Sequence, residues 1–135
     1  MKKRLIPILV LLAMALVCLS SLTAEPERPA SRAIARIWRG RTLASKADEY
    51  QAYLDTSGIS KVRATPGNLG VTVLRRNDGG KTEFLVMSVW ESVEAIKKFA
   101  GENYQKAVIL PRDREYLLEV EPTVLHYEIL REERK

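Results

Sequence analysis

The chain has 135 residues, with 22 lysines and arginines, 17 acidic residues and one histidine, for a formal net charge of +5 at pH 7. Three of the 22 basic residues stand at positions 2–4, which leaves 19 against 17 acidic residues in 25–135, an excess too small to indicate a nucleic-acid partner. The single cysteine, Cys18, also precedes residue 25, which excludes disulfide, thiolate-metal and cysteine-nucleophile chemistry from the rest of the chain.

Residues 1–24 have the pattern of a secretory signal peptide, with a basic start, an apolar run over residues 5–19, and small or polar residues up to Ala24. The run is shorter than the roughly 20 apolar residues that a membrane-spanning helix needs. We therefore expect an exported protein, periplasmic or secreted. The alternative is an uncleaved anchor formed by residues 5–19, because Leu22 is not small; only then would a membrane be a partner.

The rest of the chain divides by composition into a polar lead-in (25–32), one domain (33–131) and a charged tail (132–135). Residues 31–39 mix apolar and basic side chains in a strand-like run, which we expect Gly40 to end. A helix follows, in which Ser45 caps the first turn, apolar residues recur at helical spacing, and Gly58 marks the end.

A β-hairpin is predicted next, with strands at 69–76 and 84–90 joined by the turn sequence NDGG at 77–80. Side chains alternate across a sheet, so one face of the second strand carries Phe84, Val86, Ser88 and Trp90, and the other carries Leu85, Met87 and Val89.

A second helix over 93–100 follows the hairpin, with Ser92 as its cap and Gly101 at its end. Residues 103–122 indicate one or two short helical pieces, broken at Pro111 and finished before Pro122. Residues 123–130 are the last predicted strand.

This order of elements predicts an α+β, ferredoxin-like split βαβ fold, with a four-stranded antiparallel sheet and helices on one face. The helix-free face would then carry Leu85, Met87 and Val89, together with Leu125, Tyr127 and Ile129 of the last strand or the residues that alternate with them. Such an apolar area is larger than a soluble monomer usually exposes. We expect a homodimer in which two such faces pack together.

Four stretches carry a resemblance to a known family: IARIWRG at 34–40, RATPGNLGVTVLRR at 63–76, LVMSVWESVEAIKKFAG at 85–101 and HYEIL at 126–130. Together they resemble the antibiotic biosynthesis monooxygenase (ABM) domain of the dimeric α+β barrel superfamily, over residues 34–130. The resemblance implies a homodimer with a ligand cavity in each subunit between sheet and helices. It covers cofactor-free oxygenases, haem-degrading enzymes and members with no known reaction.

The haem-degrading branch of that family fits the sequence less well. Trp90 matches the tryptophan that this branch places over its haem. The asparagine of its first strand, however, falls at Ile37, and its haem-ligating histidine falls near Val108. Haem iron would have no axial ligand from the chain at that place.

Six residues are candidates for a site. His126, the only histidine, is a candidate base or hydrogen-bond donor, or else a strand histidine bonded to a neighbour. Arg39 is a candidate for polarising the ligand, because an arginine can attract an anionic group. A solvated edge or an ion pair between subunits is nevertheless the better interpretation for the arginines near the first strand, which are Arg36, Arg39 and Arg41. The candidates for packing a ligand, or else for plain core packing, are Trp90, Tyr50, Trp38 and Tyr104.

The expected function is that of a cofactor-independent monooxygenase acting on an aromatic or quinone-like small molecule, because the resemblance implies a substrate whose own conjugated anion reacts with oxygen. No cofactor or metal is expected, since one histidine without cysteine supplies too few ligands, and no phosphate-binding loop or nucleophile elbow occurs. The alternative is a dimeric binding or structural module without turnover, because fold alone does not decide function.

Overall fold

The computed structural model describes residues 32–133 and residue 135. The expected signal peptide, nearly all of the polar lead-in and the alternative anchor at 5–19 lie outside these residues. None of the helices formed by residues 32–133 has the length and apolar character needed to cross a bilayer.

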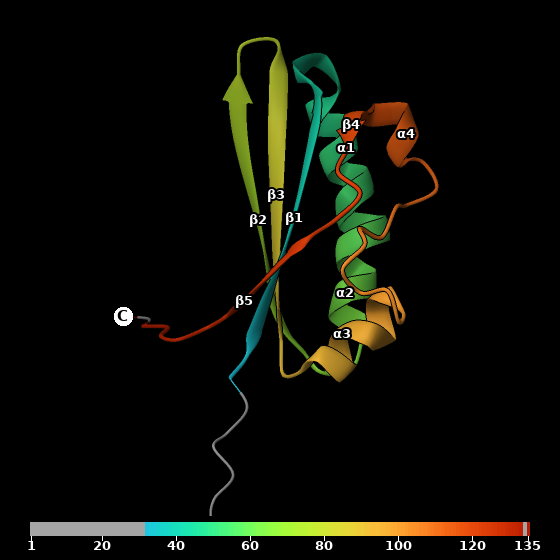
Figure 1. Cartoon of the computed structure of the whole chain (residues 1–135). Helices are drawn as coiled ribbons and strands as arrows, with labels where there is room; N and C mark the ends of the chain where they lie inside the picture. The colour runs from blue at the N-terminus through green and yellow to red at the C-terminus, as the bar shows by residue number, and fades with distance from the viewer. Residues whose placement is uncertain (1–31, 134) are drawn as a thin grey trace, which may run out of the picture. The chain divides into compact units, whose positions relative to one another are not determined.

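One antiparallel sheet forms a layer with the helices against one of its faces (Figure 1). The strand order is β2 (Asn68–Asp78), β3 (Lys81–Trp90), β1 (Ile34–Leu43) and β4 (Leu117–Val120), and β5 (Leu125–Glu128) also pairs with β1. The ferredoxin-like α+β fold is therefore confirmed. Its fourth strand position is shared by β4 and β5, each four residues long, where the sequence predicts a single strand over 123–130.

Strand β1 continues through Gly40 to Leu43, so the expectation that Gly40 ends the strand is wrong. Gly40 pairs with Phe84 of β3. A Cβ atom at this position would overlap the indole ring of Trp38. Glycine is thus required here by the close approach of a side chain, and not by a turn.

The helical layer begins with an unbroken helical run that comprises the 3-10 turn η2 (Ala44–Lys46), α1 (Ala47–Tyr53), the π-helical segment η3 (Leu54–Ile59) and α2 (Ser60–Ala64). Two expectations fail here. Ser45 makes no capping hydrogen bond and lies inside the first turn. Gly58 does not stop the helix. It lies buried inside η3, where a Cβ would lie 3.1 Å from side-chain atoms of Leu54 and Leu110.

The hairpin and the second predicted helix agree with the structure. β2 and β3 are joined at Gly79 and Gly80. Helix α3 (Val93–Ala100) begins at Ser92, whose Oγ accepts a hydrogen bond from the Ala95 N–H at 3.1 Å. It ends at Gly101, which has φ +81°.

The segment after α3 contains one short helix, α4 (Asp113–Tyr116), just beyond Pro111 as predicted. Residues 117–120 form strand β4 and not a further helical piece. They pair with β1 at residues 40–42, and Leu117 is buried. The free edge of β1 offers hydrogen-bond partners there that no helix could use.

The two faces of β3 differ in burial as the alternation predicts. Its helix-facing side chains are all buried. They pack in two clusters, one around Tyr50 and Phe84, the other around Trp90 and Ile96. The opposite face of β3 is half-buried; the register places Leu125 and Tyr127 of β5 on that same face, and they are 51% and 52% exposed.

Candidate functional site

A cavity of about 60 Å³ lies between the helical layer and the helix-facing side of β1 and β3. We call it the helix-side cavity. Its walls are mostly apolar and include Leu54, Val62, Val86, Phe99, Val108 and Leu110. Four hydrogen-bonding or charged side chains besides the Trp38 indole interrupt this lining: Arg36, Tyr50, Ser88 and Asp113.

Arg36 places a cation in this cavity wall. It stands on the helix-facing side of β1 and is only 4% exposed. Its guanidinium donates to the backbone carbonyls of Tyr104 and Lys106, the latter at 2.9 Å. Within residues 32–133 it forms no ion pair with a carboxylate. Burial lowers the pKa of Arg36 to about 10, so it is still a cation at neutral pH.

Asp113 and Tyr50 form a buried polar pair in another part of the wall. Asp113, at the start of α4, is 1% exposed, and its Oδ1 accepts a hydrogen bond from the Tyr50 hydroxyl at 3.2 Å. Its Oδ2 accepts from the Leu110 N–H at 2.7 Å. Burial raises the pKa of Asp113 although both donors oppose that change. Burial and the carboxylate of Asp113 also raise the pKa of Tyr50, which therefore stays a hydrogen-bond donor.

The two tryptophans have different places. Trp38 lines the cavity, and its buried Nε1–H has no acceptor among the described residues. Trp90 is fully buried in the core and stacks on Phe99 at 5.8 Å between ring centroids. Its Nε1–H donates to Ser88 Oγ at 2.9 Å, so Trp90 orients a cavity residue without itself being part of the lining.

His126 and Tyr104 line a separate cavity of about 180 Å³, together with Gln105 and other residues. The rings of Tyr104 and His126 pack edge to face, with 5.2 Å between their centroids. His126 Nε2 also lies 3.2 Å from Arg36 Nη1. Because a guanidinium only donates, we assign Nε2 as the acceptor and place the proton of the neutral ring on Nδ1. His126 is thereby linked to the helix-side cavity through Arg36.

The stability of the fold should fall as His126 is protonated. Burial, and then the charge of Arg36, lower the pKa of His126, whereas an unfolded histidine takes its proton at about pH 6.5. The unfolded chain therefore binds the proton first, and the free energy of unfolding drops as the pH falls below about 6.5 towards the folded-state pKa.

His126→Gln keeps an acceptor for Arg36 and cannot titrate. Denaturant unfolding at about pH 7.5 and about pH 5.5 should show a larger loss for the parent than for the variant; equal losses would refute the prediction.

Arg39 lies away from both cavities. It is exposed on the helix-free face of the sheet and lines a third hollow of about 130 Å³, whose acidic residues are Glu83, Glu119 and Glu121. Its neighbour Arg41 pairs with Glu83 at 3.0 Å in the same chain. Of the six predicted site residues, the structure thus brings Trp38 and Tyr50 to one cavity and His126 and Tyr104 to a second, with Trp90 behind Ser88 and Arg39 elsewhere.

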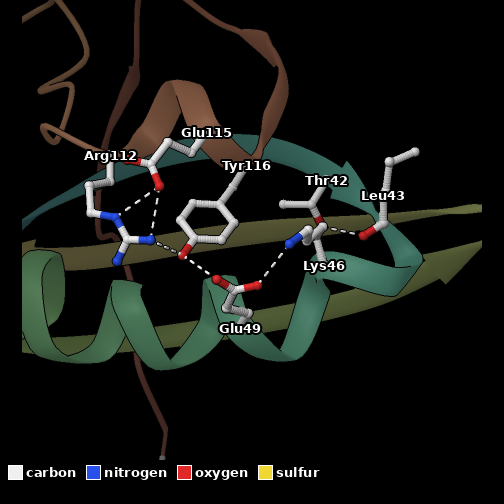
Figure 2. A network of polar contacts seen from close by, with 7 residues as sticks. All are labelled: Thr42, Leu43, Lys46, Glu49, Arg112, Glu115 and Tyr116. Carbon is white, nitrogen blue, oxygen red and sulfur yellow. Dashed lines mark hydrogen bonds and ion pairs between the residues drawn. The ribbon is translucent and has the colours of Figure 1, made fainter.

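Residues 102–112 cover the helix-side cavity and contribute Val108 and Leu110 to it. We call them the cover segment. Arg36 holds the first half of this segment by donating to the carbonyls of Tyr104 and Lys106. A polar network holds its far end against α1 (Figure 2), where Arg112 Nη2 donates to the Tyr116 hydroxyl at 2.7 Å and that hydroxyl donates to Glu49 at 2.9 Å. The Arg112 guanidinium also lies 5.3 Å from the ring centroids of both Tyr53 and Tyr116.

Arg36 and Asp113 are the two charged residues of the cavity lining, and neither is among the six predicted site residues. The sequence interpretation places Arg36 with the arginines of a solvated edge, although its spacing of two from Trp38 puts both on the same face of a strand. Asp113 gave no signal beyond that of an acidic residue at the start of a short helix. Across residues 32–133, no group of histidine, cysteine and acidic side chains is arranged to hold a metal ion.

Three comparisons place the chain among known proteins. A family model described as antibiotic biosynthesis monooxygenase matches residues 36–109. No curated protein matches the chain. Among solved structures, a putative antibiotic biosynthesis monooxygenase from Bacillus cereus is 16% identical, with a TM-score of 0.56, covering 77% of this chain and 99% of its own.

Two further solved structures share the fold. The haem-degrading protein Rv3592 from Mycobacterium tuberculosis is 22% identical with a TM-score of 0.52, covering 76% of this chain and 99% of its own. SnoaB, a cofactor-independent oxygenase from Streptomyces nogalater, is 15% identical with a TM-score of 0.50, covering 76% of this chain and 96% of its own. At these identities the likeness concerns the fold alone.

Proposed function

Because the chain belongs to the antibiotic biosynthesis monooxygenase family, we propose that it is a cofactor-independent oxygenase that binds a small hydroxylated aromatic molecule in the helix-side cavity. The observation that carries the proposal is Arg36, a buried cation in an apolar cavity with no carboxylate partner among the described residues. The ligand would place a negative charge directly beside this guanidinium as an oxyanion.

The cost of burying Arg36 supports this assignment. A charge taken out of water costs several kcal/mol unless an opposite charge compensates it. Two backbone carbonyls and a neutral imidazole satisfy hydrogen bonds of the guanidinium but leave its charge unbalanced. An aromatic oxyanion in the cavity would balance the charge, and Trp38 Nε1–H offers a further unused donor at the same wall. Such contacts lower the pKa of a bound hydroxyl and so favour the ionised ligand.

The reaction would need no group other than the substrate and oxygen. In a phenolate, electron density lies on the ring carbon opposite the oxygen, and that carbon can form a bond to molecular oxygen. The resulting hydroperoxide loses water: its O–O bond breaks, one oxygen atom stays as a new carbonyl, and the other leaves with the ring hydrogen and a proton. A phenol and oxygen thus give a quinone and water. The protein would ionise, orient and shield the substrate.

The cavity must enlarge to admit a ring. Its volume of about 60 Å³ is smaller than the roughly 150 Å³ of a protein cavity that holds benzene. The cover segment contributes Val108 and Leu110 to the lining. Its residues 102–112 form no helix or strand beyond a single bridge between Lys106 and Thr123. An outward shift of this segment is the change we propose. A ligand oxyanion at Arg36 would compete with the carbonyls that hold the segment in place.

A second candidate function is a binding module of the same fold without turnover. The small volume of the cavity is compatible with this function. Binding at Arg36 is common to both functions, and only oxygen chemistry separates them. A haem-binding function has less support, because the only histidine is half-buried and already contacts Arg36 through Nε2. Export directed by residues 1–24 remains a prediction.

Oxygen uptake distinguishes the oxygenase from the binding module. We expect the protein to convert 1-naphthol to 1,4-naphthoquinone, with one oxygen molecule consumed per quinone formed and a rate above that of autoxidation. The matched control is 1-methoxynaphthalene, which has the same rings and cannot form the oxyanion, and it should not react. Tight binding of hydroxylated naphthalenes without any quinone or oxygen uptake would contradict the oxygenase and leave the binding module.

A further inference from the structure

We infer that Asp113 is the base of this site: it takes the hydroxyl proton of the ligand inside the helix-side cavity, while Arg36 holds the oxyanion that forms. This inference rests on the proposed function, because it concerns the same ligand and the same cavity. It assigns a catalytic role to a residue that the sequence interpretation did not single out.

The position of Asp113 carries the inference. It is the only carboxylate among the residues that line the helix-side cavity, and the lining contains no histidine or lysine. At 1% exposure it is shielded from bulk water. Its two oxygens each accept one hydrogen bond, from Tyr50 and from Leu110 N–H, so each oxygen keeps lone-pair capacity for a further donor such as a ligand hydroxyl.

The other polar groups of the site are unsuited to the role. The Tyr50 hydroxyl donates to Asp113, and burial keeps its proton in place. Arg36 is a cation and has no lone pair to offer. His126 lines the other cavity and turns Nε2 to Arg36. Ser88 Oγ already accepts from Trp90, and a neutral hydroxyl is a far weaker base than a carboxylate.

The transfer conserves the charge of the cavity. The O–H bond of the ligand breaks, its proton forms an O–H bond on Asp113, and the electron pair stays on the ligand oxygen beside Arg36. The negative charge thereby moves from a carboxylate whose charged form is disfavoured by burial to an oxygen next to an unbalanced cation. Arg36 and Asp113 both line this cavity and are both buried, and burial strengthens the attraction between the guanidinium and the oxyanion.

The structure also gives Asp113 a holding role, and the test must separate the two. Asp113→Asn retains that role, because the amide oxygen can accept from Leu110 N–H and the amide NH₂ can donate to the Tyr50 oxygen. The variant loses the ability to take a proton. A purely structural aspartate would therefore be replaced by asparagine with little effect on the number of protons released when a ligand binds as the anion.

The probe is 4-nitrophenol, whose anion absorbs visible light while the neutral phenol does not. At about one pH unit below the pKa of the free probe, some 10% of it is ionised in solution. We expect both the parent protein and Asp113→Asn to bind the probe as the anion, because Arg36 is present in both. The parent should keep the proton on Asp113, whereas Asp113→Asn should release about one proton to the buffer for each probe bound. Above the pKa of the probe, where the anion is supplied ready-made, the variant should bind it at least as tightly as the parent.

A second measurement uses the parent protein alone and does not depend on the variant's folding. Calorimetry in two buffers with different heats of ionisation counts the protons released on binding. Transfer to Asp113 predicts an ionised bound probe with no proton released to the buffer. Release of about one proton per probe by the parent, or equal proton release by the parent and Asp113→Asn, would overturn the inference and leave the proposed site intact. Failure of the parent to bind the probe at all would contradict both the inference and the proposed function.

Discussion

Arg36→Met is expected to weaken the binding of 4-nitrophenolate about 10- to 100-fold, because hydrogen bonds to a charged group are worth roughly 1.5–3 kcal/mol. Methionine has a comparable length and no charge, so the cavity wall keeps its bulk while the cation is lost. The titration is read at a pH at which the probe is fully ionised, so the effect reports on anion binding alone. Oxygen uptake should fall with it.

Two variants serve as controls for this result. Arg36→Lys keeps the positive charge and should retain much of the binding, although an ammonium cannot reproduce the forked contacts of a guanidinium. Arg39→Met removes an arginine three residues away, on the helix-free face of the sheet, and should leave probe affinity unchanged. Unfolding curves establish that each variant is folded. Loss of binding in Arg39→Met with full binding in Arg36→Met would restore the sequence-based assignment and refute ours.

Met87→Asp is expected to convert a dimer into monomers, with a dissociation constant raised 100-fold or more. We propose that the chain forms a homodimer through its helix-free sheet face. Met87 lies at the centre of that face, where the register aligns it with Ile37, which in turn aligns with Leu125. Burying one such side chain is worth about 1.5–3 kcal/mol, and each dimer would lose two of them and bury two unpaired carboxylates.

Sedimentation velocity at micromolar concentration reads this effect directly. The parent should sediment as two chains and Met87→Asp as one. Ala52→Asp adds the same charge on the exposed side of α1 and should remain a dimer. A parent that sediments as a single chain across this concentration range would contradict the proposed pairing of sheets.

The sequence predicted the sheet and helix α3 well because the deciding signals there are local. Alternation along β3 separates a buried row from a half-buried one without any knowledge of tertiary contacts. Ser92 and Gly101 bound α3 through capping geometry that depends only on neighbouring residues. The prediction that a glycine ends an element fails at Gly40 and Gly58. At both positions the missing Cβ leaves room for packed side chains, which are the Trp38 ring at Gly40 and Leu54 and Leu110 at Gly58.

The site was harder to predict than the fold for a related reason. Arg36 has a chemical role only because the carbonyls of residues 104 and 106 fold back over it and bury it. Strand alternation separates it from Arg39 and Arg41, which fall on the other face, but an arginine is so rarely buried that the sequence alone favours a solvated edge. Asp113 reaches the cavity through the course of the cover segment, which no local pattern in the sequence specifies.

A crystal structure of the protein with 4-nitrophenol bound is the most direct test of the account. The prediction is a ring in the helix-side cavity, an outward shift of the cover segment, and the phenolic oxygen within about 3.2 Å of a guanidinium nitrogen of Arg36. A ring bound instead in the cavity beside Tyr104 and His126, or one whose oxygen points away from Arg36, would contradict it.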